Sequence, residues 1–320
     1  MATDLLAYHP VHIEPIVATC YDFLDALYAF GRLDDYTEGL YLNPSTTYEQ
    51  AQRNQHNFLL DQIRCEKGSR ILDIGCGAGT LLEEAERRGA RVVGITVSSA
   101  QVARCRKKGL DVRLLDYRDL GHEWNGRFDG IVANGSIEHF VQPQDAIEGR
   151  QDGIYRDLFR TCSRLLDPRS PSKRFATTVL HFRGKSIDPS VALHNPFSLP
   201  YGSDEFHYAW LMQSMGGYYP VVGQLERCAK RCFALESEND GTEDYYLTSK
   251  QWMNRIYAAL LRPTTMPFVW KEIGWWVLHH PRQVTMGLLA VLLFRSWLWQ
   301  FQPTSPPMIL LRQTWHATER

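Results

Sequence analysis

The most informative run of residues in this chain reads Ile71-Leu72-Asp73-Ile74-Gly75-Cys76-Gly77-Ala78-Gly79-Thr80. An apolar segment leads into Asp73, three alternating glycines follow, and a helical pattern of apolar residues begins directly after them. This order predicts a buried strand, a tight turn and a helix start. Glycines let the backbone approach a ligand closely, and amide groups at a helix start can receive polar atoms. We therefore expect a ligand-binding loop at the carboxyl edge of an α/β sheet.

Strand and helix patterns alternate on both sides of this run. Such alternation predicts a doubly wound, mostly parallel sheet with a Rossmann-like arrangement of helices. Helices are also expected over 17–30 and 48–63, a helix-strand pair over 223–247, helices over 248–300 and a last strand over 309–315. The core strands are predicted at 70–74, 91–95, 111–115, 128–133 and near 174–181, and the helices between them at 79–88, 98–108, 144–148 and 152–166.

We divide the chain into a helical cap (1–65), an α/β core (66–184), an insertion (185–222) and a final part (223–320) that completes the core. The insertion is rich in aromatic residues, Pro and Gly, so it is either a substrate lid or a surface subdomain with its own small core. Residues 270–299 hold five of the nine tryptophans. They form either a buried core or dimer helix, or an interfacial helix or lipid-site wall. Their apolar run 286–294 is shorter than the roughly 20 residues that span a bilayer.

Composition narrows the classes of function. The chain has 320 residues, 44% hydrophobic and 22% charged, which is typical of a globular protein. A net charge of −1 without a basic tract argues against a nucleic-acid partner. The seven cysteines lack metal-ligand spacing, so we expect no metal site and a reducing, cytoplasmic location. The first residues lack a basic region followed by an apolar core, so no signal peptide is expected.

Polar residues stand where the second and third predicted strands end. Thr96 takes the place where nucleotide-type sites carry an acid for the ribose hydroxyls, and Gln101 follows one turn into the next helix. Both side chains can form hydrogen bonds to a ribose. After the third strand, Asp116 can accept from an adenine amino group and Tyr117 can stack on the ring, unless the pair serves only as a turn.

The fourth predicted strand ends in Asn134 and is followed by small residues that leave room for a ligand. Glu138 and His139 come directly after them, where a base would be needed for catalysis. The alternative is a surface carboxylate beside a helix-capping residue. Both interpretations place the pair at the same sheet edge as the glycine loop.

Together these segments resemble the class I S-adenosylmethionine (SAM) methyltransferases, and within them the cyclopropane fatty acid synthase and mycolic acid methyltransferase family. The glycine run 73–79 is similar to the SAM loop of the class. The resemblance extends over about residues 20–255. The motifs that indicate the family are Tyr36 to Tyr41, Thr47 to Gln52, Gly94 to Ser98 with Gln101, Asp116 to Asp119, Ser136 to Phe140, and Gly216-Gly217 before Pro220.

The resemblance implies SAM as the cofactor and 66–184 as the SAM-binding core. Each part of the cofactor is then matched to residues of this chain. Tyr36 and Thr37 would close over the methionine side, Asp73, Gly75 and Gly77 would hold the amino acid moiety, Thr96 and Gln101 the ribose, and Asp116 and Tyr117 the adenine, with Asn134 beside them.

The resemblance also implies a catalytic set. The family methylates an electron-rich carbon, usually an alkene of an acyl chain, and uses a bound bicarbonate as base. Glu138, His181 and Tyr245 match its ligands, with Tyr246 a rival for the last, and His139 stands next to Glu138. The remaining ligand, a Cys in the family, is Glu38 here, and like charge makes bicarbonate doubtful. Paired carboxylates raise a pKa, so Glu38 is a protein base, a sign of another substrate, or a structural residue.

We therefore predict a SAM-dependent methyltransferase that C-methylates or cyclopropanates an alkene of a lipid or isoprenoid-type substrate. The alternative is N-methylation of a small amine, positioned and deprotonated by Glu138 and His139, with S-methylation of a thioether or thiol as a third option. A non-catalytic SAM-binding partner protein is disfavoured because Glu138, His181 and Tyr245 occur together. The expected partners are a small-molecule or lipid substrate and a membrane contacted peripherally, and the oligomeric state is not predicted.

Overall fold

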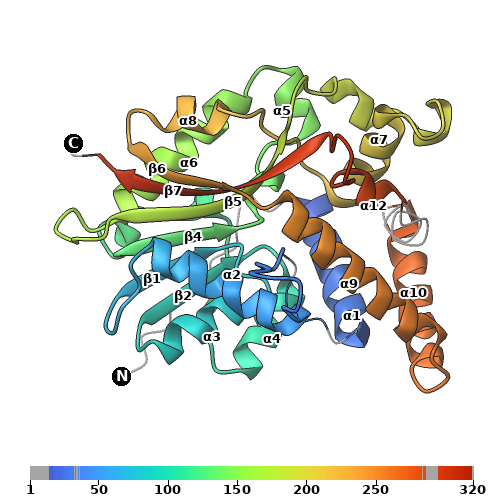
Figure 1. Cartoon of the computed structure of the whole chain (residues 1–320), viewed down its shortest axis with the longest axis horizontal. Helices are drawn as coiled ribbons and strands as arrows, with labels where there is room; N and C mark the ends of the chain where they lie inside the picture. The colour runs from blue at the N-terminus through green and yellow to red at the C-terminus, as the bar shows by residue number, and fades with distance from the viewer. Residues whose placement is uncertain are drawn as a thin grey trace.

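The computed structural model describes residues 14–31, 33, 35, 37–282, 284–285 and 295–318. Within these residues a seven-stranded sheet has the order β3-β2-β1-β4-β5-β7-β6 (Figure 1). The first five strands pair in parallel, and β7 runs antiparallel to both β5 and β6. This topology confirms the predicted doubly wound, mostly parallel fold. The strands are Arg70–Ile74 (β1), Arg91–Thr96 (β2), Val112–Leu114 (β3), Gly130–Asn134 (β4), Arg174–Phe182 (β5), Phe233–Asp240 (β6) and Met308–Ala317 (β7).

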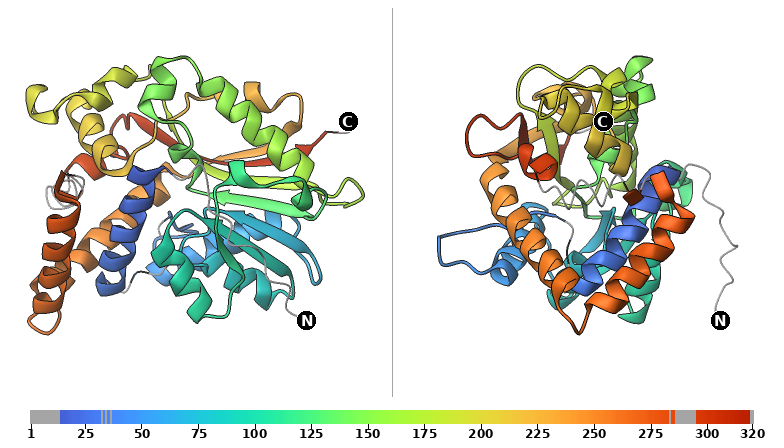
Figure 2. Two further views of the ribbon diagram at one scale, coloured as in Figure 1. Left: turned by 180° about the vertical axis from the view of Figure 1, so that it is seen from behind. Right: turned by 90° about the vertical axis from the view of Figure 1, so that its right-hand side faces the viewer.

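Helices cover the sheet and extend beyond one of its ends. Figures 1 and 2 show α1, α9 and α10 side by side beyond the carboxyl ends of the parallel strands, and these helices contact one another. The described helices are Pro15–Gly31 (α1), Tyr48–Gln62 (α2), Thr80–Arg87 (α3), Ser99–Lys107 (α4), Pro143–Ile147 (α5), Gln151–Leu165 (α6), Asp204–Met215 (α7), Gln224–Ala229 (α8), Thr242–Leu261 (α9), Met266–His279 (α10) and Arg295–Trp299 (α12).

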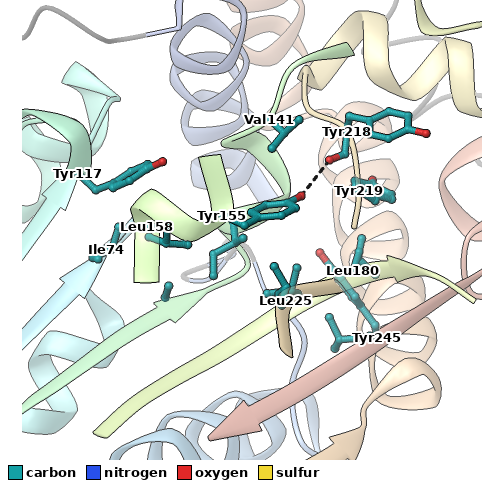
Figure 3. Close-up of a cluster of buried hydrophobic side chains, with 14 of the residues drawn as sticks. Ile74, Tyr117, Val141, Tyr155, Leu158, Leu180, Tyr218, Tyr219, Leu225 and Tyr245 are labelled. Carbon is teal, nitrogen blue, oxygen red and sulfur yellow. Dashed lines mark hydrogen bonds between the residues drawn. The ribbon is translucent and has the colours of Figure 1, made fainter. Parts of the chain in front are cut away.

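Local sequence explains the elements that hold the site. Every residue of β5 is buried, as expected for a central strand covered on both faces. Helix α2 begins at a capping box, in which Thr47 and Gln50 each accept from the other's backbone amide. Helix α6 buries Tyr155 and Leu158 on its apolar face. Figure 3 shows Tyr155 inside this core, with its hydroxyl donating to the Tyr218 carbonyl at 3.4 Å.

The insertion 185–222 contains the buried helix α7. The three tyrosines Tyr208, Tyr218 and Tyr219 surround Phe182 of β5 with ring centroids 5.4–5.9 Å apart. The insertion therefore shares the core of the sheet. Its role as a lid stays a prediction.

The Trp-rich part of the chain divides between surface and interior. Trp270 and Trp275 on α10 are exposed, Trp276 and Trp297 are half-buried, and Trp299 is buried. The predicted apolar run 286–294 lies outside the described residues. In the described part of the chain, every helix is too short or too polar to cross a bilayer.

Candidate active site

A pocket of about 940 Å³, partly open to solvent, lies at the carboxyl ends of the first four strands. The topology explains this position, because the carboxyl ends of parallel strands meet at one edge of the sheet. Of the ten predicted cofactor residues, Tyr36 lies outside the described residues, and the structure brings the other nine to the pocket wall. These nine are Thr37, Asp73, Gly75, Gly77, Thr96, Gln101, Asp116, Tyr117 and Asn134.

The glycine loop turns sharply after β1. Gly75, Gly77 and Gly79 have φ values of 81°, 53° and 78°, a left-handed region that favours glycine. The amide of Gly75 donates to the Ile95 carbonyl at 2.8 Å, which fixes the loop against β2. A Cβ added to Gly75 would lie 2.5 Å from the Cβ of Ser136, so the loop leaves no space for a side chain there.

Asp73 is a buried acid on the pocket wall. Its Oδ1 has no hydrogen-bond partner among the residues that the structure describes. Burial, with a smaller contribution from the nearby Asp35 carboxylate, raises the pKa of Asp73 to about 8. A buried carboxyl of this kind is stabilised when a ligand supplies a positive charge or a donor. The position suits the ammonium group of an amino acid moiety.

A hydrogen-bond network beside Asp73 was not anticipated from the sequence. Asp35 accepts from the His56 ring, from Thr80 Oγ1 at 2.8 Å and from Thr37 Oγ1 at 3.2 Å. His56 is a polar residue on the buried face of α2, and a polar residue at such a position could have indicated the network. The network fixes the loop that carries Thr37 over the pocket.

The residues predicted to bind the ribose and the adenine line the same pocket, and only Asp116 differs from expectation, because it is already paired with Arg118. Thr96 Oγ1 donates to Gln101 Oε1 at 2.6 Å, so both groups lie at the end of β2 as expected. Tyr117 stacks on Phe140 with ring centroids 4.4 Å apart. Both carboxylate oxygens of Asp116 accept from the Arg118 guanidinium, at 2.8 and 3.0 Å. Only the remaining lone pairs of Asp116 can therefore receive a ligand donor.

Glu138 and His139 belong to one short turn, Ile137–His139, but they serve different places. His139 lines the pocket, and its Nε2 lies 2.8 Å from the Tyr21 hydroxyl. Glu138 is buried, and its Oε1 accepts from the Leu180 amide at 2.8 Å. Burial lowers the pKa of His139 to about 4 and raises that of Glu138 to about 7. At neutral pH the imidazole is uncharged, and Glu138 is able to exchange a proton.

The predicted catalytic residues other than His139 do not line the pocket, and three of them, Glu38, Glu138 and Tyr245, form a deeper cluster. Glu38, Glu138 and Tyr245 are buried and close enough to interact electrostatically. His181 follows Leu180 on β5, and its Nδ1 donates to the Val179 carbonyl at 2.9 Å. Burial lowers the pKa of His181 to about 4. Three atoms of the predicted catalytic residues away from the pocket lack hydrogen-bond partners within the described chain: Glu38 Oε2, Glu138 Oε2 and His181 Nε2.

Arg312 of β7 is a residue of this cluster that the sequence analysis missed. Its Nη1 donates to Asp244 at 2.8 Å, its Nη2 to the Gly39 carbonyl at 3.0 Å and its Nε to Gln55 at 2.8 Å. Nε also lies 3.3 Å from Glu38 Oε1. Arg312 is the single Asp, Glu, Lys or Arg of β7, and a lone charge within a predicted strand is the signal that could have indicated it, although not its partners.

Glu38 holds a proton more readily than an ordinary glutamate. Burial and, to a smaller extent, the Glu138 and Asp244 carboxylates raise its pKa to about 8, against the opposing effect of Arg312. A bicarbonate would add another anion beside these carboxylates, and Arg312 already has its own partners. The residues present therefore do not fit bicarbonate.

Comparisons with known proteins agree with this geometry. The chain is 30% identical over 229 residues to the cyclopropane-fatty-acyl-phospholipid synthase of Escherichia coli strain K12, which covers 68% of this chain and 50% of that protein. The chain thus spans about half the length of the curated relatives it matches.

Two solved structures share the fold. The cyclopropane synthase MmaA2 of Mycobacterium tuberculosis has a TM-score of 0.68 at 18% identity, covering 95% of this chain and 97% of that chain. Coclaurine N-methyltransferase has a TM-score of 0.70 at 14% identity, covering 96% and 83%. The family model described as mycolic acid cyclopropane synthetase matches residues 12–266. The chain, with its class I methyltransferase fold, therefore belongs to the mycolic acid cyclopropane synthetase family, as its motifs predicted.

Proposed function

We propose that this chain is a SAM-dependent methyltransferase that methylates or cyclopropanates an alkene carbon of a lipid or isoprenoid-type substrate. The family and the nine predicted cofactor residues on one pocket wall support SAM as the cofactor. One observation carries the choice of substrate. A second cavity, of about 590 Å³ and almost entirely apolar, lies among α1, α7, α9 and α12.

The apolar cavity adjoins the buried acid cluster. Trp252 and Trp297 line the cavity, and their rings lie 5.7 and 6.3 Å from the Tyr245 ring. Cys20 lines the cavity on α1, and the next residue, Tyr21, lines the pocket. A hydrocarbon chain in the cavity would thus have its reactive carbon near both sites, and walls of this kind suit apolar ligands.

The residues of the chain have three tasks in this reaction. SAM, when bound, supplies an electrophilic methyl group. The apolar walls orient the alkene and exclude water from a cationic carbon. Glu138, with its free Oε2 and a pKa near neutrality, takes the proton that the methylated carbon releases, and Glu38 is the second candidate for that proton.

Segment 185–222 is included in the proposal as the lid. Gly217 has a φ of 100°, and a Cβ added there would lie 2.4 Å from the Glu138 carbonyl oxygen. The amide of Gly217 also donates to Gln142 at 3.2 Å. The lid thus rests directly on the turn that carries Glu138 and His139. A cytoplasmic location with peripheral membrane contact completes the proposal.

N-methylation of a small amine is the second candidate function. The aromatic rings of the apolar cavity favour it, because Tyr28, Trp252 and Trp297 could hold a cation by cation–π contact. Transfer of label from methyl-labelled SAM into an unsaturated phospholipid extract, with amine and thiol pools in parallel, tests both. We expect label in the lipid fraction, and label confined to the amine pool would replace the proposal by its alternative.

Gly75→Ala is expected to remove SAM binding, with Gly109→Ala as the matched control. The two glycines have φ values of 81° and 82°, so alanine costs each about 1–2 kcal/mol of unfolding free energy. A Cβ at Gly109 meets no described atom within 4 Å, whereas at Gly75 it overlaps Ser136. Calorimetric titration with SAM should show an affinity loss of roughly tenfold or more for Gly75→Ala alone. Equal affinities would mean that the loop does not hold the cofactor.

Filling the apolar cavity is expected to block the lipid but not the cofactor. Ile256 is buried and lines the cavity on α9. Ile256→Trp should lower methyl transfer to unsaturated lipid by roughly tenfold or more, because the larger side chain occupies space that the hydrocarbon chain needs. SAM affinity should stay unchanged. Ile256→Val removes a methylene and should retain transfer. Full activity of Ile256→Trp would place the substrate elsewhere.

A further inference from the structure

Helix α10 has an outward stripe of apolar and basic side chains. Phe268, Trp275 and Leu278 are 66%, 49% and 80% exposed, and Lys271 is exposed between them. Spacings of three, four and three residues place these four side chains on one helical face. We call them the α10 stripe. Val269 and Ile273 are buried on the other side of the helix.

The stripe lies beyond the part of the chain that the family accounts for. The family match ends at residue 266, where α10 begins. Figures 1 and 2 show α10 at the margin of the molecule, next to α9 and α1. Large apolar side chains that gather on an exposed face indicate a binding surface, whereas isolated ones do not.

We propose that the α10 stripe docks on an anionic lipid surface. Trp and Lys are side chains that suit the headgroup layer, with Phe and Leu entering the acyl boundary. Lys271 carries the charge that complements anionic headgroups. Glu272 is the acidic residue of α10. It is half-buried and accepts from Trp276 Nε1 at 3.1 Å, so it lies on the flank of the stripe.

A second copy of this chain fits the stripe less well. The core of a protein–protein interface is depleted of lysine, and Lys271 stands in the middle of this stripe. A stable dimer also takes about 20–30 residues from each side, which four side chains on one helix do not supply. The composition therefore favours lipid as the occupant.

The stripe also lies close to the proposed substrate cavity. Trp276 on the flank of α10 contacts Phe23 of α1 with ring centroids 5.7 Å apart, and Phe23 lines the apolar cavity. A docked lipid surface would therefore be separated from the cavity by this pair of rings. Only this step of the inference rests on the proposed lipid substrate.

Co-sedimentation of the full chain with vesicles tests the docking. The vesicles contain phosphatidylcholine alone or phosphatidylcholine with phosphatidylglycerol. The wild type should bind the anionic vesicles, more weakly as salt is raised. The triple variant Phe268→Ser, Trp275→Ser, Leu278→Ser should bind them roughly tenfold or more weakly, and Lys271→Glu should lose the preference for anionic vesicles. Leu42→Ser is the matched control, because Leu42 is 68% exposed and lies in the segment before α2, outside the α10 stripe.

The possible outcomes separate clearly. Equal binding by the wild type and the triple variant, or no binding by the wild type, would overturn the docking surface. A wild-type dimer that the triple variant breaks, without vesicle binding, would assign the stripe to a second copy. Methyl transfer to lipid in detergent micelles is measured in parallel. If micellar lipid is not methylated but vesicles are bound, the proposed function fails and the docking surface stands.

Discussion

Glu138→Gln is expected to lower methyl transfer by about 10²- to 10⁴-fold, the usual contribution of a positioned acid–base group. The amide keeps the shape of the side chain and can still accept from the Leu180 amide, which now meets Oε1 at 2.8 Å. It cannot take a proton. Glu138 is absent from the wall of the cofactor pocket, so SAM affinity should stay unchanged. Initial rates at saturating SAM, together with calorimetric SAM titration, measure the two quantities separately.

Glu226→Gln provides the control for this prediction, because Glu226 is an exposed glutamate on α8. It should behave as the wild type in rate and in SAM affinity. The wild-type rate should rise with pH through about 7, since Glu138 must lose its proton before it can act as a base. A Glu138→Gln rate within about threefold of the wild type would exclude the residue as the base.

Glu38→Gln is expected to lower the rate by about 10²-fold and to remove the increase in rate at the upper end of the pH range. Burial holds the pKa of Glu38 at about 8, so the wild-type rate should still increase as pH passes that value. The glutamine variant should reach its plateau earlier, near the pKa of Glu138. A purely structural Glu38 would leave the shape of the profile unchanged, and full activity of the variant would exclude Glu38 as a base.

Glu38→Cys makes this test more specific, because it places at position 38 the cysteine that the family resemblance implies there. The wild type should be indifferent to removal of bicarbonate from the buffer, because Glu38, Glu138 and Asp244 already crowd the site with carboxyl groups. The cysteine variant removes one of them and should become sensitive to added bicarbonate. A wild type that needs bicarbonate would restore the ordinary family mechanism.

The raised pKa values also predict how stability depends on pH. Glu38 and Asp73 hold protons in the folded chain up to a pKa of about 8, above their ordinary values of 4.5 and 3.8. The folded state therefore binds more protons than the unfolded state between these limits. This contribution to stability is complete below the ordinary values and is lost as pH rises through about 8. Asp73→Asn should reduce the dependence of the unfolding free energy on pH, measured by denaturant unfolding across this range.

The cofactor pocket was largely predictable because its determinants are local. Glycines, apolar runs and polar strand ends can be read from a few adjacent residues. Parallel pairing then places Thr96, Asp116 and Asn134 at one edge of the sheet. The structure accordingly brings the predicted residues that it describes to one pocket.

The rest of the site depends on contacts between distant segments. Arg312 contacts Gln55 and Gly39, which lie more than 250 residues away in the chain. No local pattern in the sequence predicts which residues it contacts. Adjacent residues can also diverge, as Glu138 and His139 do, because a short turn directs their side chains to different places. Helix α7 was not predicted because its polar and apolar residues are not separated onto different faces, so its sequence lacks a helical period.

Methyl transfer from labelled SAM to unsaturated phospholipid, by the wild type and by Glu138→Gln side by side, tests the proposed chemistry most directly. We expect labelled lipid from the wild type, a loss of about 10²-fold or more in the variant, and equal SAM affinity for both. Mass spectrometry of the labelled lipid then distinguishes a methyl group from a cyclopropane. An unlabelled lipid fraction with label in the amine pool, or undiminished transfer by Glu138→Gln, would contradict the proposed function or the assigned base respectively.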